Sequence, residues 1–264
     1  MLRTQKLSAP SIPLDTSPGT LAPPAEVYPL DVLPNPAPAS KPPRRRLRSF
    51  FRWSLLALAL LWLTAALLLV AARWIDPPTT AMHIERRIQS WFSQTPYNKR
   101  YNFIPLSQIS PNLQHAVVAA EDARFYHHHG FDWHAIHLAA QEDLEGDRTR
   151  GGSTLTQQLV KNLFFGTNRT IFRKAAEASL VPVAELVLGK RRILELYLNV
   201  VEWGPGVYGA DAASRFHDKT SARAIDRQQS ARLAAILPAP LKRRPERMNS
   251  YSSVILRRMR QMGW

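Results

Sequence analysis

The spacing of apolar residues predicts a mainly α-helical fold. From residue 112 onward, apolar positions recur every three or four residues, as on one face of an α-helix, and strand-like alternation is scarce. Glycine and proline clusters interrupt this pattern at 151–152, 204–209 and 238–245, and no internal repeat is visible. The predicted helices span residues 112–121, 132–145, 153–165, 170–181, 189–200, 209–216, 226–236 and 250–262.

One stretch is apolar on every face. Residues 53–72 carry no charge, and a helix of that length spans roughly 30 Å, the thickness of a bilayer's hydrocarbon core. We therefore predict a transmembrane helix, with bounds 50–73. The stretch lies well inside the chain and is longer than the core of a usual signal peptide. These features favour an uncleaved anchor.

The distribution of charge orients this anchor. The chain has a formal net charge of +15, and a cluster of cations precedes the apolar stretch, whereas only Arg73 and then Asp76 follow it. By the positive-inside rule, the N-terminus is cytoplasmic and the residues after 73 lie outside the cytoplasm. Since the membrane span explains the basic run, no nucleic-acid partner is expected. The preceding cations are Lys41, Arg44, Arg45, Arg46, Arg48 and Arg52.

The remaining boundaries follow from composition. Residues 1–49 form a proline-rich, basic tail that is predicted to be disordered, because it has too few apolar residues to bury. Residues 74–111 are predicted to be a juxtamembrane linker with a short amphipathic helix near the lipid headgroups. Residues 112–264 are the predicted catalytic domain. The chain has no cysteine, so neither disulfides nor thiolate metal sites are available.

Reactive groups are concentrated in residues 121–130. Glu121 ends a predicted helix, where the helix dipole disfavours a carboxylate, so this group is a candidate base. A solvated surface pair of Glu121 and Asp122 is the alternative. Nearby histidines raise the further alternative of a transition-metal site. They are His127, His128, His129, His134 and His137.

A glycine-rich loop then leads into a helix with one polar face. Gly151 and Gly152 allow close backbone approach, and Ser153 or Thr154 can cap the helix. The polar face offers donors for a sugar and a cation for a phosphate. An ordinary solvated helix face is the alternative. The polar face contains Ser153, Gln157, Gln158, Lys161 and Asn162.

A third segment combines cations with a carboxylate. Glu177 lies one helical turn beyond Arg173 and Lys174, which is also the spacing of a surface salt bridge. The functional interpretation is a carboxylate that orients the cations or helps to hold a metal against a diphosphate.

Taken in order, these segments resemble the five motifs of glycosyltransferase family 51, the biosynthetic peptidoglycan transglycosylases. The resemblance covers roughly residues 80–262. The layout of the chain, with a single membrane helix, resembles the monofunctional form of the family. It rests on Glu121–Asp122 with Phe125, His128 and Gly130, on Gly151–Asn162, on Arg173, Lys174 and Glu177, on Lys190 with Ile193–Asn199, and on Leu233–Pro240.

The resemblance implies a lysozyme-like helical domain with a smaller membrane-associated jaw lobe. It implies lipid II and the growing glycan strand as substrates, with Glu121 as general base and Glu177 beside the donor diphosphate. A divalent cation, Mg²⁺ or Mn²⁺, is expected at Glu177. The implied substrate-binding residues are Ser153, Gln158, Lys161, Asn162, Arg169, Arg173 and Lys190.

The same resemblance implies a bacterial inner-membrane protein with a periplasmic catalytic domain. Cell-wall synthesis or division proteins are candidate partners. Peptidoglycan cleavage by a muramidase and a non-catalytic scaffold for wall assembly are the alternatives. A sugar hydroxyl needs a base, and a departing diphosphate needs cations, which agrees with one carboxylate facing a basic cluster. Pro182 is expected to kink or break its helix.

Overall fold

The computed structural model describes residues 44–93, 97–144, 151–167 and 170–264. Contacts divide the chain into two units, Met1–Arg48 and Ser49–Trp264, and the fold below is that of the second unit. The predicted disorder of the N-terminal tail concerns residues that lie almost entirely outside the described part.

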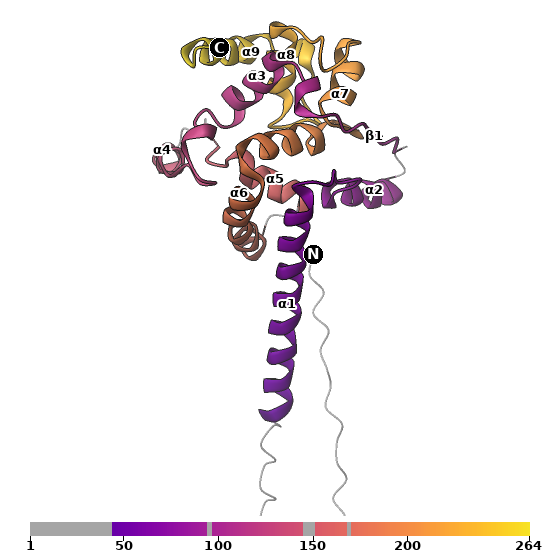
Figure 1. Ribbon diagram of the computed structural model, residues 1–264, viewed down its shortest axis with the longest axis vertical. Helices are drawn as coiled ribbons and strands as arrows, with labels where there is room; N and C mark the ends of the chain where they lie inside the picture. The colour runs from indigo at the N-terminus through magenta and orange to yellow at the C-terminus, as the bar shows by residue number, and fades with distance from the viewer. Residues whose placement is uncertain (1–43, 94–96, 145–150, 168–169) are drawn as a thin grey trace, which may run out of the picture. The chain divides into compact units, whose positions relative to one another are not determined.

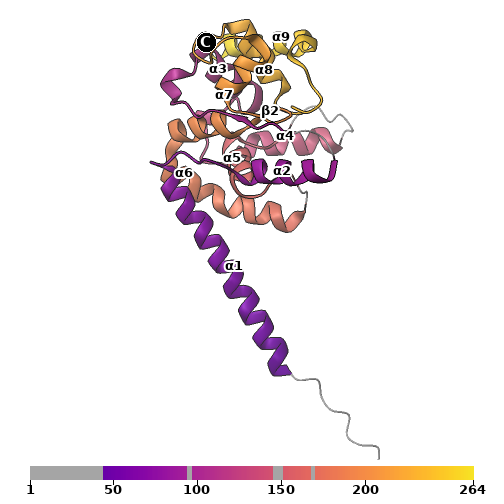
Figure 2. The same cartoon turned by 90° about the vertical axis from the view of Figure 1, so that its right-hand side faces the viewer.

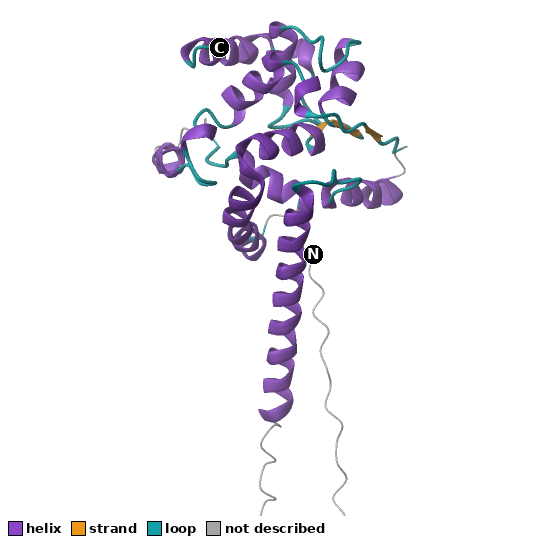
Figure 3. Ribbon diagram, in the orientation of Figure 1, coloured by secondary structure: helices purple, strands orange, loops and turns teal. Residues whose placement is uncertain are grey.

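The described residues are predominantly helical, which confirms the predicted fold class (Figures 1 and 3). The helices are α1 (Arg44–Ala72), α2 (Ala81–Ser93), α3 (Pro111–Glu121), α4 (Trp133–Leu144), α5 (Leu155–Phe164), α6 (Ile171–Val200), α7 (Ala210–Ala213), α8 (Arg227–Ile236) and α9 (Asn249–Gln261). The strands are β1 (Arg100–Tyr101), β2 (Glu202–Gly204) and β3 (Val207–Tyr208).

Helix α1 covers the predicted span of 50–73 except for its last residue, Arg73. Its 25 residues from Arg48 to Ala72 have a mean hydropathy of 2.6 and are long and apolar enough to cross a membrane. No other helix among the described residues meets these criteria. Its last turns pack on the domain, because Ala66, Leu69 and Ala72 are buried.

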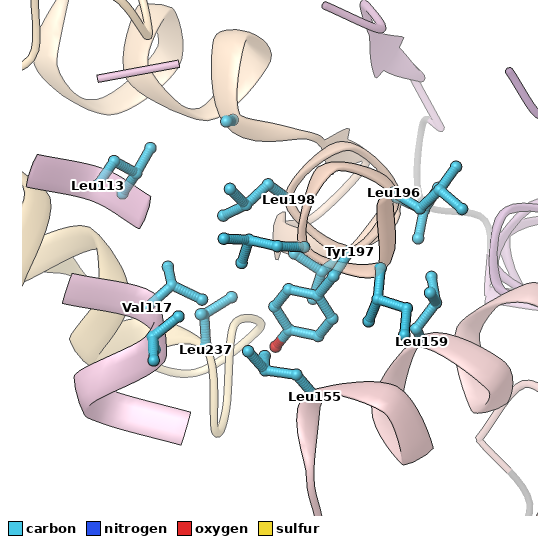
Figure 4. Packing of buried hydrophobic residues seen from close by; sticks show 14 of the residues in the cluster. Leu113, Val117, Leu155, Leu159, Leu196, Tyr197, Leu198 and Leu237 are labelled. Carbon is cyan, nitrogen blue, oxygen red and sulfur yellow. The ribbon is translucent and has the colours of Figure 1, made fainter. Parts of the chain in front are cut away.

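The core lies where α3, α5, α6 and α8 meet. Tyr197 of α6 is fully buried at its centre, between Leu155 and Leu159 of α5 and Val117 of α3 (Figure 4). Helices α8 and α9 pack beside α3, and α2 lies next to α5 in both views (Figures 1 and 2). This core fixes the C-terminal end of α3 against the N-terminal end of α5.

A small sheet that the sequence did not predict joins the linker to the later part of the chain. Strand β3 is central, parallel to β1 and antiparallel to β2. Gly206 makes the turn between β2 and β3 with φ of 72°, a conformation that favours glycine. The strands are too short for alternation of side chains to be visible in the sequence.

The prediction that Pro182 kinks or breaks its helix was wrong. Helix α6 continues through Pro182, and its backbone leaves helical geometry at Gly189, with φ 69° and ψ 162°. Pro182 is exposed, so water can solvate the carbonyl that loses its amide partner. Gly189 takes the positive φ at little cost.

Candidate active site

Helix α3 places Glu121 at its final position, as the sequence predicted. Pro111 begins the helix, and the buried residues Leu113, Val117 and Val118 hold it against the core. Asp122 follows as the C-cap residue, and its N–H donates to the carbonyl of Val118. The adjacent carboxylates therefore separate at the point where the helix ends.

Asp122 has a structural role. Its Oδ2 accepts from the N–H of Leu155, the first residue of α5, at 2.9 Å. Its Oδ1 lies 2.9 Å from His128 Nε2. His128 Nδ1 accepts from the N–H of Gly130 at 3.1 Å, which leaves Nε2 as the donor to Asp122. These bonds dock the start of α5 beside Glu121.

The start of α5 is closed by a capping box. The Thr154 side chain accepts from the N–H of Gln157, and the Gln157 side chain accepts from the N–H of Thr154. Thr154 is thus the cap that the sequence left open between two residues. Gln157 is buried in this box, so it does not share the polar face predicted for it.

Glu121 is held by a hydrogen bond at one carboxylate oxygen, and the other oxygen has no partner among the described residues. Gln158 Nε2 donates to Glu121 Oε2 at 2.8 Å, and Tyr197 Oη donates to Gln158 Oε1 at 3.0 Å. Glu121 Oε1 is buried and has no hydrogen-bond partner among the described residues. The relay from Tyr197 fixes the carboxylate and leaves one lone-pair acceptor for a ligand.

The environment makes Glu121 a stronger base than an exposed glutamate. Burial raises the pKa of Glu121, and the hydrogen bond from Gln158 and the charge of Lys161 oppose that rise. The residue as a whole is only part-buried, but Oε1 itself is shielded from solvent. The carboxylate therefore lines a cavity while its unpartnered oxygen is desolvated.

Glu121 opens into a first cavity of about 410 Å³. Helix α9 contributes Arg258, Gln261 and Tyr251 to its wall, and Arg258 donates to the carbonyl of Ala119 at 3.3 Å. The loop before α5 contributes Ser153. Sequence motifs did not identify the α9 side chains, because they lie more than one hundred positions from Glu121.

A second cavity of about 430 Å³ adjoins the first at Ser153. Gln158 lies between the two, since it lines the second cavity while donating to Glu121. The structure thereby brings together residues from three sequence motifs. The predicted site residues that line the second cavity are Ser153, Gln158, Lys161, Asn162, Arg173 and Glu177.

Glu177 organises the cations of the second cavity. Its Oε2 accepts from Arg173 Nη1 at 2.9 Å and its Oε1 from Lys174 Nζ at 2.6 Å. The Glu177 side chain is only 2% exposed, so these are charge-assisted bonds in a desolvated site. The salt bridges that the sequence spacing allowed are therefore present, and both of their cations line the cavity.

Lys161 is the third cation here. Burial lowers its pKa, and the negative charge of Glu177 opposes that effect. Lys161 lies on α5 one turn after Gln158, so a single helix links the basic cavity to the carboxylate of Glu121.

One predicted binding residue, Lys190, lies away from both cavities. Its Nζ pairs with Glu185 at 2.8 Å and stands 4.6 Å from the ring centre of Phe125. Arg169 lies outside the described residues. The binding role of both residues stays a prediction.

The donor set does not fit a resident metal ion. Both oxygens of Glu177 already accept bonds from cations, whereas Mg²⁺ binds through several oxygen ligands. Within the described residues, no group of three His, Asp or Glu side chains gathers. The five histidines between 127 and 137 therefore form no such group either. A divalent cation at Glu177 would take most of its ligands from a bound diphosphate.

The second cavity contains two residues that the motifs missed. Arg86 of α2 pairs with Glu202 of β2 across its wall, with Nη2 and Oε2 2.9 Å apart. Arg86 belongs to α2, the amphipathic helix that was predicted to lie near the lipid headgroups. Only the fold places it over the cavity.

Comparison with known proteins matches this region of the chain. A family model described as transglycosylase matches residues 87–260. Relatives named biosynthetic peptidoglycan transglycosylase include one from Pseudomonas putida, 44% identical over 79% of this chain and 91% of the relative. Another, from Ectopseudomonas mendocina, is 43% identical over 82% of this chain and 91% of the relative.

Proposed function

The chain belongs to the transglycosylase family, and from this premise we propose that it polymerises lipid II into β-1,4-linked glycan strands. Its enzymatic activity is peptidoglycan glycosyl transfer. The observation that supports the detailed chemistry is the geometry of Glu121, which lines a cavity beside the basic cluster and has one oxygen fixed by Gln158 and the other buried without a hydrogen-bond partner among the described residues.

In this proposal Glu121 acts on the acceptor. Oε1 removes the proton from the 4-hydroxyl of the acceptor's GlcNAc, and the hydroxyl oxygen attacks C1 of the donor's MurNAc. The acceptor lies in the first cavity, which Glu121 lines, and its hydroxyl meets the oxygen that has no hydrogen-bond partner. Because attack and departure occur on opposite faces of C1, the configuration inverts.

The basic cluster acts on the leaving group. The bond between C1 and the diphosphate oxygen breaks, and its electron pair leaves with undecaprenyl diphosphate. Lys161, Arg173 and Lys174 face the second cavity and stabilise that charge without donating a catalytic proton. A divalent cation that arrives with the diphosphate would add positive charge there, but the proposal needs no step through it.

The membrane anchor suits this substrate. A lipid-linked donor stays in the bilayer, so an enzyme on a membrane helix meets it in two dimensions. We assign the chain to a bacterial inner membrane, with a cytoplasmic N-terminus and a periplasmic catalytic domain. The cations before α1 support that orientation. Cell-wall synthesis or division proteins are proposed partners.

One experiment separates this function from glycan cleavage and from a scaffold role. Purified full-length protein is incubated either with lipid II or with finished glycan strands, and the products are resolved by gel electrophoresis. The proposal predicts longer chains from lipid II and no shortening of finished strands. Shortened strands would indicate a muramidase, and no change in either would indicate a scaffold.

A further inference from the structure

The contacts of Lys190 are with other residues of the domain. Lys190 lines neither the first nor the second cavity, and its side chain is 21% exposed. Its Nζ lies 2.8 Å from Glu185 Oε1 and 4.6 Å from the ring centre of Phe125, a distance at which an ammonium group is attracted to an aromatic ring. Lys190 therefore joins a carboxylate of α6 to a ring that follows Glu121 by four positions.

The ion pair depends on the irregular backbone of α6. Glu185 and Lys190 are five positions apart, and in an unbroken helix about 140° of rotation would separate their side chains. At Gly189 the backbone leaves helical geometry, with φ 69° and ψ 162°, and this region is almost confined to glycine. The break changes the direction of Lys190, which then reaches Glu185. Gly189 thereby allows a pair that helical spacing does not predict.

Glu185 makes the connection to α5. Its Oε1 accepts a hydrogen bond from Thr156 Oγ1 at 2.6 Å as well as the bond from Lys190 Nζ. Thr156 is fully buried in the first turn of α5, two positions before Gln158. The Glu185 side chain is only 9% exposed, so its charge would be costly to keep there without a cation. The ion pair therefore fixes the turn that bears the hydrogen-bond donor to Glu121.

Phe125 makes the connection to the loop after α3. Its side chain is fully buried, and its N–H donates to the carbonyl of Asp122 at 3.0 Å, which ties its backbone to the residue that follows Glu121. Contact with Lys190 holds the ring against α6. The ion pair thus contacts both segments that set the orientation of the Glu121 carboxylate, the loop after α3 and the start of α5.

We propose that Lys190 is a positioning residue, which keeps the general base aligned with its hydrogen-bond donor and does not contact the substrate. This inference rests on the proposed function, in which Glu121 must point at an acceptor hydroxyl. The family resemblance implied a substrate contact for Lys190. The two roles predict different kinetics, because a residue that aligns a base affects kcat, whereas a contact made equally in the ground and transition states affects KM.

The test measures steady-state kinetics of lipid II polymerisation for Lys190→Met beside wild-type protein. Because this substitution leaves the Glu185 carboxylate without its cation, a double variant, Lys190→Met with Glu185→Gln, is measured as well and leaves no unpaired charge. Arg191→Met, at the adjacent exposed position of the same helix, is the matched control. Thermal unfolding is recorded for each full-length protein, and rates are expressed per folded molecule.

We expect Lys190→Met to lower kcat about tenfold and to change KM less than about twofold, as for a misaligned base. The double variant should show the same fall, and Arg191→Met should match wild type. Lys190→Arg keeps a cation that can pair with Glu185 and stack on Phe125, so it should recover most of the loss. A KM raised about tenfold with kcat unchanged would show a substrate contact and overturn the inference, as would wild-type values of both constants.

A second measurement separates alignment from a general loss of structure. In Gln158→Ala the donor to Glu121 is already absent, so adding Lys190→Met should lower kcat by less than about twofold more. A further fall of about tenfold would mean that Lys190 acts independently of this hydrogen bond, and would overturn the inference while the proposed function stands. Wild-type protein that joins no lipid II would overturn the proposed function, and this inference with it.

Discussion

Gln158 donates a 2.8 Å hydrogen bond to Glu121 and so joins the start of α5 to the end of α3. Tyr197 fixes the amide from the other side, because its hydroxyl donates to Gln158 Oε1. The orientation of Glu121 is therefore set by a buried tyrosine at the centre of the core. A reactive group at a helix end is thus held by a side chain of the buried core.

Substitution of Gln158 should impair the chemical step. In Gln158→Ala the carboxylate loses its fixed donor, so we expect kcat to fall about 10- to 100-fold with a smaller change in KM, as for a misplaced catalytic group. Steady-state kinetics with lipid II measure this. Tyr197→Phe, which keeps the ring and removes only the hydroxyl, should give a milder loss. A Gln158→Ala effect confined to KM would contradict the positioning role.

The dependence on pH should have two limbs. Burial raises the pKa of Glu121 above the usual 4.5 of a glutamate, so kcat/KM should fall as acid protonates the base. Burial also lowers the pKa of Lys161 below 10.5, so activity should fall again as alkali neutralises this cation. Gln158→Ala should move the acid limb to higher pH, because its hydrogen bond favours the ionised carboxylate. An acid limb at or below pH 4.5 would contradict this assignment.

The cations of the second cavity should matter most to the leaving group. Lys161→Met removes a charge that faces the cavity, and we expect kcat to fall at least about 100-fold, as for the loss of one group that stabilises a developing negative charge. Lys242→Met is a suitable control, since Lys242 is exposed and lines neither the first nor the second cavity. Equal activities of the two variants would argue against a diphosphate in this cavity.

Chelation should slow the reaction without abolishing it. Four protein cations already line the second cavity, and Glu177 is engaged with two of them. With EDTA we expect a loss of less than about tenfold, compared with the larger loss for Lys161→Met. Measuring turnover over a series of Mg²⁺ concentrations tests this. Complete and reversible loss on chelation would show that the metal is essential.

The sequence predicted individual helices better than the contacts between segments that are distant in the sequence. Periodicity located α3, α5, α8 and α9 to within two residues, and Thr154 acted as one of the two expected caps. The prediction at Pro182 failed because the residue lies on the exposed face of the helix, where water can replace the lost backbone hydrogen bond. Which face of a helix is exposed depends on tertiary packing.

The site residues divide in the same way. Glu121, Lys161 and Glu177 stand out because each has a charge in a distinctive local setting. Arg86, Glu202 and Arg258 do not, because only contacts between distant segments bring them to the cavities. A salt bridge along one helix can be predicted from its spacing, whereas a pair between α2 and β2 depends on the whole fold.

The most direct measurement is polymerisation of lipid II by Glu121→Gln beside wild-type protein, with thermal unfolding recorded on both. The amide keeps the shape and cannot accept the acceptor's proton, so turnover should fall at least about 1000-fold. Because burial raises the pKa of Glu121, its ionisation costs stability as pH rises through that pKa. The variant should therefore be at least as stable as wild type at neutral pH. Turnover near the wild-type rate in a folded Glu121→Gln protein would contradict the assignment of Glu121 as the base.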